Sequence, residues 1–506
     1  MSLKYYFLLI PIFLPILSCS KVNPTEQPIK GISSHTSGRK LQNPYSVSNM
    51  RKAYQALNSP TKSNFQGADE DNIIFTTHYY VKFSPRNEDD LSELKSDSTL
   101  VLFQAPLDYE ILPPDDYAAS EAQTPSPLYA SVPASKDLSG INSPFEILEE
   151  LFIPDDGDFP ATKGQYTYSD DFIDALVYKS LELTDNLEDP TPGTKANTEW
   201  HPQGRVTYYD DVLSATLPIE GLQVRCKRWF TTHKAYTDKN GYFYCEKTFK
   251  NPANYSIVFE RYDFEIRSKG TSTAEYDGPK TSGAWVVDFS KNNLLTYYST
   301  IFRAAYKFYY QNIHGLSRPP ENGFWRTQLK IKASTDTKNE YGSTNPARRF
   351  LGIGSMVKIF TYAEGTLQTY ATTIHELAHA AHWNLVIKDD DSNRNKNYNN
   401  AEDSMCESWA TGLQWYLTKD VYASYLGKYP FGEYTNVVMD LIDMEGEINN
   451  GLQFDGVDNL DIVEIQNALK GATSWTEWRN NITKKYPSQK NSIYALFTYW
   501  KTTGGF

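Results

Sequence analysis

The sequence predicts a multidomain α+β protein, and three patterns along its 506 residues support this fold class. Helix and strand signals alternate over residues 45–200. Tight turns with β-branched and aromatic residues dominate residues 201–275, and helical periodicity dominates residues 276–506. The chain is 40% hydrophobic and 14% aromatic, so it can fill several cores. We therefore predict an N-terminal α+β unit, a central β-sandwich, and a C-terminal unit with a mixed sheet edge followed mostly by helices.

Residues 1–19 have the pattern of a bacterial export signal. Lys4 precedes a short apolar run that ends in Ile16-Leu17-Ser18-Cys19. This ending resembles a lipobox, which implies that Cys19 is acylated and becomes the new N-terminus; cleavage by an ordinary signal peptidase is the alternative. A lipid on Cys19 would anchor an exported protein to a bacterial membrane, which we expect to be the outer one, on its periplasmic or cell-surface face. Residues 20–44, rich in Ser, Thr, Lys, Gly and Pro, are then a tether.

The N-terminal unit, residues 45–200, contains helix and strand signals but no motif that indicates chemistry. A strand, a capped helix and a second strand predict a β-α-β order near its start. The predicted helices are Tyr45–Leu57, Asn87–Leu94, Pro144–Phe152 and Asp171–Leu183. The predicted strands are Tyr79–Phe83, Thr99–Phe103 and Leu128–Val132.

Residues 201–275 predict a β-sandwich. The turn Asp238-Lys239-Asn240-Gly241 lies between aromatic and β-branched segments, as a tight turn between strands does. With Gly221 and Val224, this segment resembles the carboxypeptidase-regulatory-like, transthyretin-like β-sandwich, which implies a non-catalytic accessory domain. Cys226 and Cys245 fall on neighbouring predicted strands and could form a disulfide in an exported protein; two buried free thiols are the alternative.

The C-terminal unit, residues 276–506, begins with a long aromatic helix and two strands. These elements are predicted at Leu294–Tyr310, Thr327–Lys332 and Ser355–Tyr362. Later helices are predicted at Val437–Met444, Ile462–Leu469 and Ser492–Trp500.

The strongest motif in the chain, His375-Glu376-Leu377-Ala378-His379, follows the second of these strands. Apolar residues recur at steps of three and four from Leu367 to Leu385, which predicts an amphipathic helix opened by Gly365 and Thr366. Histidines four residues apart project from one side of a helix and can hold one zinc ion. Glu376 would then take a proton from water at the metal.

A catalytic zinc site needs a third protein ligand, and Glu407 is the best candidate. It lies on a second predicted helix that Asp403 or Ser404 can cap, after an exposed polar connection over Lys388–Asn400. Glu402 is the rival third ligand, because spacing alone does not separate the two glutamates. His382 is a weaker rival, since seven residues place it roughly 10 Å from His375 along the helix axis.

The motif and Glu407-Ser408-Trp409-Ala410 together resemble the gluzincins, the thermolysin-like zinc metallopeptidases. The resemblance implies that His375, His379 and Glu407 bind Zn²⁺ and that Glu376 is the general base in peptide-bond hydrolysis. It also implies that Met356–Tyr362 is a sheet-edge strand that pairs with a protein or peptide substrate. Such enzymes further use a Tyr or His to stabilise the oxyanion, and the sequence does not single one out.

Two other functions stay open at this point. One is a catalytically silent, adhesion-type binding lipoprotein with a structural zinc site, against which the intact Glu376 argues. The other is hydrolysis of a non-peptide amide. The net charge of −13 argues against a nucleic-acid partner, because a phosphate-binding surface is expected to be basic.

Overall fold

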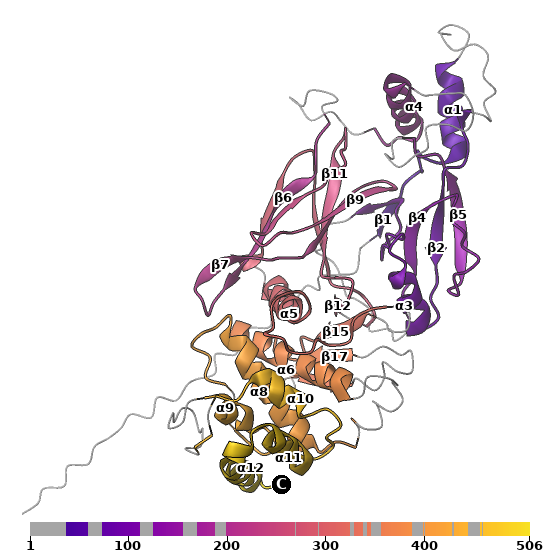
Figure 1. Ribbon diagram of the computed structural model, residues 1–506. Helices are drawn as coiled ribbons and strands as arrows, with labels where there is room; N and C mark the ends of the chain where they lie inside the picture. Colours follow the sequence, from indigo (N-terminus) through magenta and orange to yellow (C-terminus); the bar gives the residue numbers. More distant parts are fainter. Residues whose placement is uncertain are drawn as a thin grey trace, which may run out of the picture.

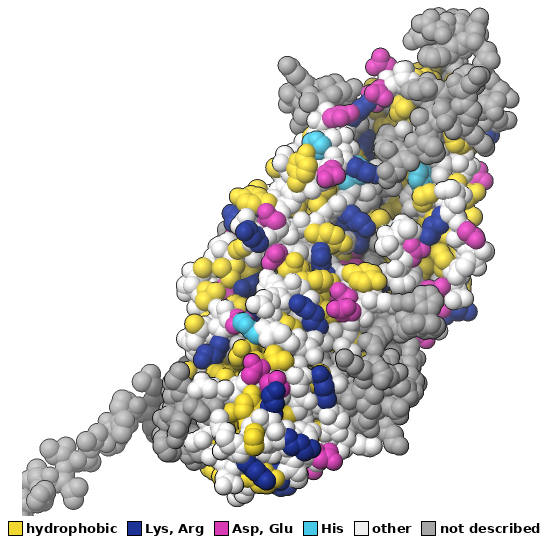
Figure 2. All heavy atoms as spheres, viewed as in Figure 1, with side chains coloured by type: hydrophobic (Ala, Val, Ile, Leu, Met, Phe, Trp, Pro, Cys, Tyr) yellow, Lys and Arg dark blue, Asp and Glu magenta, His cyan; other side chains and the backbone are white. Residues whose placement is uncertain are grey.

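The protein is an α+β chain in which an N-terminal unit and two facing sheets lie side by side at one end of the molecule, and a helical C-terminal unit forms the other end (Figure 1). The computed structural model describes residues 37–58, 73–111, 125–154, 169–187, 199–268, 270–291, 293–323, 328–336, 342–345, 356–386, 398, 400–427, 430–443, 456–457 and 459–506. The predicted signal, Cys19 and most of the tether lie outside these residues. Acidic and basic side chains are interspersed on the face that Figure 2 shows.

The N-terminal unit is built on an antiparallel sheet in which β2 lies between β4 and β5. Its strands are β1 (Ser37–Lys40), β2 (His78–Phe83), β3 (Tyr109–Ile111), β4 (Leu128–Pro133) and β5 (Phe145–Leu151). Its helices are α1 (Val47–Leu57), α3 (Glu88–Ser96) and α4 (Asp170–Leu183). The side chains of Ser46, Asn87 and Ser169 accept hydrogen bonds from backbone N–H groups in the first turns of these helices, which fixes where each helix begins.

Two predicted elements of this unit are wrong. The predicted helix Pro144–Phe152 is strand β5, which pairs with β2 along its whole length. The predicted strand Thr99–Phe103 forms only one bridge, between Phe103 and Tyr129. The apolar residues of β5 fit both a helical and an alternating pattern. Pairing with the edge of β2 selected the strand, and the sequence does not show that this edge is available. The sheet is therefore antiparallel and not β-α-β.

Two four-stranded sheets follow and pack face to face. One contains β6 (Gln203–Asp210), β7 (Ala215–Pro218), β10 (Tyr242–Tyr244) and β14 (Trp285–Asp288). The other contains β8 (Gln223–Arg228), β9 (Thr231–Tyr236), β11 (Ala253–Val258) and β13 (Glu275–Thr281). The Trp285 ring of the first sheet lies 5.3 Å from the Tyr255 ring and 6.2 Å from the Tyr276 ring of the second, between ring centroids. The predicted turn at Asp238–Gly241 joins β9 to β10 and so connects the two sheets.

Cys226 and Cys245 are both buried and are free thiols, so the structure has the alternative to the predicted disulfide. Cys226 lies on β8 of one sheet, whereas Cys245 directly follows β10 of the other. Strands that looked like neighbours along the chain thus belong to opposite layers. Burial raises the pKa of the Cys245 thiol to about 11, and burial and the neighbouring Cys245 raise that of Cys226 further.

The C-terminal unit is organised around a mixed sheet, with strand order β12-β15-β17-β16. These strands are β12 (Phe264–Arg267), β15 (Leu329–Ala333), β16 (Gly342–Asn345) and β17 (Met356–Ile359). β12, β15 and β17 are parallel to one another, and β16 is antiparallel to β17. Helices α5 (Asn293–Tyr310) and α6 (Gly365–Val386) pack against this sheet. β12 falls within residues 201–275 but pairs here, whereas β14, which begins at Trp285, pairs with β6.

The prediction that Met356–Tyr362 forms the edge of this sheet is wrong. Its strand β17 lies between β15 and β16, and β16 is the edge strand. The sequence did not predict β16, because Gly342-Ser343-Thr344-Asn345 is short, polar and without apolar alternation.

In the described part of the chain, five further α-helices complete the unit around a core rich in tryptophan. They are α8 (Asp403–Lys419), α9 (Val437–Ile442), α10 (Ile462–Asn467), α11 (Trp475–Lys485) and α12 (Lys490–Gly504). The sequence did not predict α11, whose Trp475 and Trp478 are buried against each other and against Phe497 of α12. None of the helices in the described part of the chain combines the length and apolarity that a membrane crossing requires.

Buried charges join the N-terminal unit to the sheet of the C-terminal unit. Glu265 and Arg267 of β12 are both fully buried, and Arg267 Nε donates to Glu265 Oε1 at 2.7 Å. Lys95 of α3 forms an ion pair with Glu265, and Arg267 donates to both carboxylate oxygens of Glu88 at 2.7 and 2.9 Å. Burial alone would raise the pKa of Glu265, but Arg267 and Lys95 outweigh it and lower this pKa. Each buried charge depends on its partner.

We predict that Arg267→Ala lowers the free energy of unfolding by about 3–5 kcal/mol, because it leaves the buried Glu265 with too little positive charge. Denaturant titration would measure the change. Arg39→Ala is the matched control: the Arg39 side chain is 73% exposed in its ion pair with Glu110, so the expected loss is below about 1 kcal/mol. Equal losses in the two variants would contradict the assignment.

Candidate metal centre

Helix α6 carries His375, Glu376 and His379, as the periodicity predicted. Gly365, with φ of +84°, adopts the left-handed conformation that lets the chain turn from β17 into the helix. The sequence predicted that one face of this helix is buried, but every residue from Thr369 to Trp383 is buried. The helix packs against α5, α8, β16 and β17. Its polar side chains therefore lie inside the protein and need polar partners there.

Glu407, in the second turn of α8, is the partner of the two histidines. The Nε2 atoms of His375 and His379 are 3.2 Å apart, and Glu407 Oε2 lies 3.0 and 3.3 Å from them. One ligand atom from each residue fits within a group no wider than 4.8 Å. Two imidazoles and a carboxylate converging in this way can hold a metal ion.

The electrostatics of the group favour positive charge between the three side chains. Burial would lower the pKa of His379, but the carboxylate of Glu407 outweighs it and raises this pKa to about 9. Burial would likewise raise the pKa of Glu407, but His379 and His375 hold it far below its ordinary value. Glu407 is therefore a carboxylate at any ordinary pH, which is the form that binds metals.

The three converging side chains of His375, His379 and Glu407 are called the metal group below. Tyr398 is a neighbour of this group that sequence reasoning missed. Its hydroxyl oxygen lies 3.1 Å from His379 Nδ1, so it can fix the ring orientation and leave Nε2 for a metal. The residue belongs to the segment Lys388–Asn400, which was predicted to be an exposed connection and lies mostly outside the described residues. A single aromatic residue in a run of Asp, Asn, Lys and Arg was the available signal.

The two alternative ligands, Glu402 and His382, make other contacts. Glu402 is the N-cap residue of α8, a position predicted for Asp403 or Ser404, and its Oε2 accepts a hydrogen bond from the backbone N–H of Trp475 at 2.7 Å. His382 packs edge-on against the Tyr398 ring, and burial lowers its pKa to about 3. Neither residue belongs to the group that converges on one point. Glu402 instead fixes the start of α11.

The edge strand β16 passes directly over Glu376. A Cβ atom added at Gly342 would lie 2.5 Å from Glu376 Oε1, closer than real Cβ atoms approach other atoms. Only glycine lets the strand lie so close to this carboxylate. Sequence alone gave no reason to connect Gly342 with the motif 33 residues later.

A short turn lies on another side of the group. The backbone groups of Phe431 and Tyr434 exchange two hydrogen bonds of 3.1 Å, and the Tyr434 ring lies 5.8 Å from the His375 ring. Ser408, next to Glu407 in sequence, donates to the carbonyl of Glu433 at 2.9 Å and so ties the turn to α8. Phe431 is 80% exposed. Tyr434 is thus a tyrosine that the fold brings to the metal group.

Comparison with known proteins does not identify the chain: no family model matches it, and no curated protein is significantly similar. The assignment therefore depends on the residues themselves. The structure describes His375, Glu376, His379 and Glu407 and brings the three candidate ligands together. Cys19 lies outside the described residues.

We predict that the apparent affinity for Zn²⁺ rises about tenfold from pH 7 to pH 8. His379 must be neutral to bind a metal, and its pKa of about 9 means that a proton competes at both pH values. Competition against a chelator of known affinity would measure the change. In His314→Ala, which removes an exposed histidine paired with Asp420, the same pH dependence is expected. A pH-independent affinity would contradict a protonated His379.

Proposed function

We propose that this chain is a zinc-dependent peptidase of the gluzincin type, with a thermolysin-like C-terminal unit. The observation that carries the proposal is the convergence of His375, His379 and Glu407 next to Glu376. Two histidines and a glutamate are the protein ligands typical of a catalytic zinc site that keeps a position open for water. A structural zinc site usually has four protein ligands, which favours the enzyme over the catalytically silent binding protein.

The chemistry divides between the metal and Glu376. Zinc in such a site supplies a Lewis acid that polarises a carbonyl and lowers the pKa of water. Glu376 accepts the proton of the attacking water and returns it to the amine that leaves when the C–N bond breaks. His375, His379 and Glu407 hold the metal, and Tyr398 orients His379. Tyr434, beside His375, is a candidate for the residue that stabilises the oxyanion.

Strand β16 gives the substrate a place to bind. An edge strand presents unpaired backbone groups with which an extended peptide can pair. β16 is the edge next to Glu376, so a peptide paired with it would lie with its backbone close to the general base. The substrate is therefore a protein or peptide in an extended conformation, and β16 takes the role that the sequence assigned to Met356–Tyr362.

The remaining parts fit an anchored enzyme. A lipid on Cys19 would attach the enzyme to a bacterial membrane, which we expect to be the outer one. The tether would then hold the folded part in the periplasm or outside the cell. The two facing sheets would serve as a transthyretin-like accessory domain. We propose no nucleic-acid partner, in keeping with the net charge of −13.

Variants of three site residues and one control test the proposal. Glu376→Gln is expected to keep near-stoichiometric zinc and to lower kcat/KM on a cleaved peptide about 100- to 10,000-fold. His379→Ala and Glu407→Ala are expected to lose zinc as well, whereas Glu402→Gln, the matched glutamate control, keeps both zinc and activity. Elemental analysis and a peptide-library assay give the two readouts.

Three results would count against this assignment. Retained activity in Glu376→Gln would remove it as the base. Zinc retained in Glu407→Ala and lost in Glu402→Gln would exchange the third ligand. Zinc binding without cleavage of any peptide would favour the structural-zinc alternative or a non-peptide amide substrate.

Gly342→Ala separates the position of Glu376 from metal binding. The added methyl group must displace either β16 or the carboxylate, and a shift of about 1 Å at a general base can cost up to about 100-fold in rate. We expect zinc content to be unchanged and kcat/KM to fall about 10- to 100-fold. Gly283→Ala, where an added Cβ has open space apart from Thr281, is the control. Unchanged activity in Gly342→Ala would contradict the close approach.

A further inference from the structure

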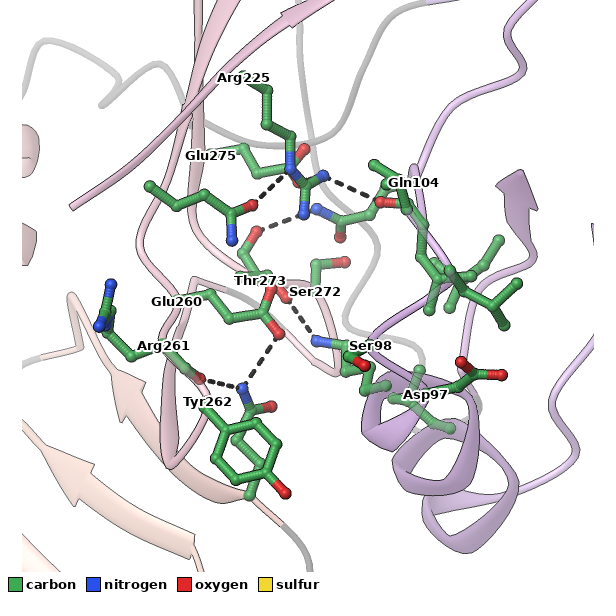
Figure 3. Close-up of a pocket in the computed structure, with 18 of the residues that line it drawn as sticks. Asp97, Ser98, Gln104, Arg225, Glu260, Arg261, Tyr262, Ser272, Thr273 and Glu275 are labelled. Atoms are coloured by element: carbon green, nitrogen blue, oxygen red, sulfur yellow. Dashed lines mark hydrogen bonds and ion pairs between the residues drawn. The ribbon is translucent and has the colours of Figure 1, made fainter. Parts of the chain in front are cut away.

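A cavity of about 150 Å³ lies where the three parts of the molecule meet, away from the metal group. The N-terminal unit contributes the end of α3 and the residues after it, including Asp97 and Ser98. The second facing sheet contributes Gln223 and Arg225 of β8. The segments before β12 and β15 contribute residues 260–262 and Gln328. Figure 3 shows Ser98 on one side of the hollow and Glu260, Tyr262 and Thr273 on the other.

Two of the cationic side chains in the wall, Lys95 and Arg225, already have polar partners. Lys95 pairs with Glu265 and donates to Thr273 Oγ1 at 2.7 Å. Arg225 donates to the carbonyl of Leu102 at 2.9 Å and to Gln223 Oε1 at 2.6 Å, with Glu275 at 3.6 Å. The wall as a whole has little net charge to attract a strongly charged ligand, because its cations nearly balance its acids: Lys95, Arg225, Lys234 and Arg261 against Asp97, Glu260 and Glu275.

Gln328 is a buried side chain of the cavity wall that holds Glu260 in place. Its side chain is 6% exposed, and its Nε2 donates to Glu260 Oε1 at 3.0 Å and to the carbonyl of Arg261 at 2.6 Å. Its Oε1 is buried and accepts no hydrogen bond from a described residue. This oxygen has almost no accessible surface, so a ligand cannot reach it, and the role of Gln328 is to orient the Glu260 carboxylate.

Glu260 offers a hydrogen-bond acceptor to the cavity, and its surroundings leave little net negative charge to attract a cation. Its carboxylate accepts from Gln328 and forms no ion pair with any described residue. The ammonium of Lys95 lies near enough to interact electrostatically with it. A hydroxyl group, which donates without carrying charge, therefore matches this position better than an ammonium group.

The N-terminal unit also contributes apolar side chains to the wall, and the rim is aromatic. Four leucines line the cavity: Leu91, Leu100, Leu102 and Leu128. The Tyr262 side chain, 56% exposed, stands at the edge of the hollow (Figure 3). A ligand that matches both the polar and the apolar side chains needs apolar C–H faces together with several hydroxyl groups. A sugar ring has both.

We propose that this cavity is a binding site for a neutral sugar, one ring of which enters between the leucines and the Glu260–Gln328 pair. The volume equals that of about five water molecules at roughly 30 Å³ each, which suits one small ring and is below the roughly 300–1,000 Å³ of sites for larger ligands. Hydroxyl groups donate to Glu260, and the Tyr262 ring covers an apolar face of the sugar. The site is independent of the metal group, so it adds binding to the proposed hydrolysis.

Saturation-transfer NMR and calorimetry on the full chain in detergent would test the proposal. The neutral probes are glucose, galactose, mannose and N-acetylglucosamine, and the charged probes are glucuronic acid and putrescine. At least one neutral sugar is expected to bind saturably. Tyr262→Ala and Glu260→Gln are each expected to weaken it about tenfold, the effect of one contact of about 1.4 kcal/mol.

The controls separate this site from folding and from hydrolysis. Tyr178→Ala removes a tyrosine on α4 that is 60% exposed and should leave sugar binding unchanged. Glu376→Gln should also leave it unchanged, so the result does not depend on peptidase activity. The proposal is overturned if none of the neutral sugars binds, if only a charged probe binds, or if the Tyr262 and Glu260 variants bind as well as the wild type.

Discussion

The candidate site depends on the burial of α6 between the sheet and α8. Thr361 Oγ1 donates to Thr369 Oγ1 at 2.9 Å, and this pair fixes the start of the helix against the end of β17. The apolar residues of α6 fill the space towards the sheet, which directs the two histidines towards α8. Because an unpaired buried charge is costly, Glu407 and the histidines are stable there only as a group. Buried charges need partners of opposite sign, and the arrangement that meets this need also suits the group to a cation.

The sheet beneath α6 is itself held by the rest of the molecule. Its outer strand β12 shares buried charges with α3 of the N-terminal unit. On another side, the buried Asp210 of β6 accepts hydrogen bonds from Tyr422, at 2.7 Å, and from Arg303 of α5, at 3.2 Å. Both links join charged or polar groups that would be destabilised alone. The N-terminal unit has apolar cores of its own but is tied to the C-terminal unit by these buried charges, and a sugar bound at their junction would contact both.

Much of the fold could be predicted from local patterns, and the errors share one cause. The helices at Val47–Leu57, Asn293–Tyr310 and Gly365–Val386 have long periodic patterns that fit only a helix. Phe145–Leu151 fits two patterns, and pairing with β2 selected the strand. Gly342–Asn345 has no pattern at all and is a strand only because β17 offers it an edge. Short segments take their structure from partners distant in sequence, which no local pattern shows.

The sequence by itself determined the chemistry of the candidate site: His375, Glu376 and His379 are placed by the 3.6-residue period of one helix. Only the tertiary structure showed that Glu407 and not Glu402 meets the two histidines, because spacing alone favours Glu407 but does not exclude Glu402. It also decided that Tyr398 supports His379 and that Gly342 lies against Glu376. The reason is physical: spacing within one helix is fixed by backbone geometry, whereas spacing between elements is fixed by the packing of side chains across the whole fold.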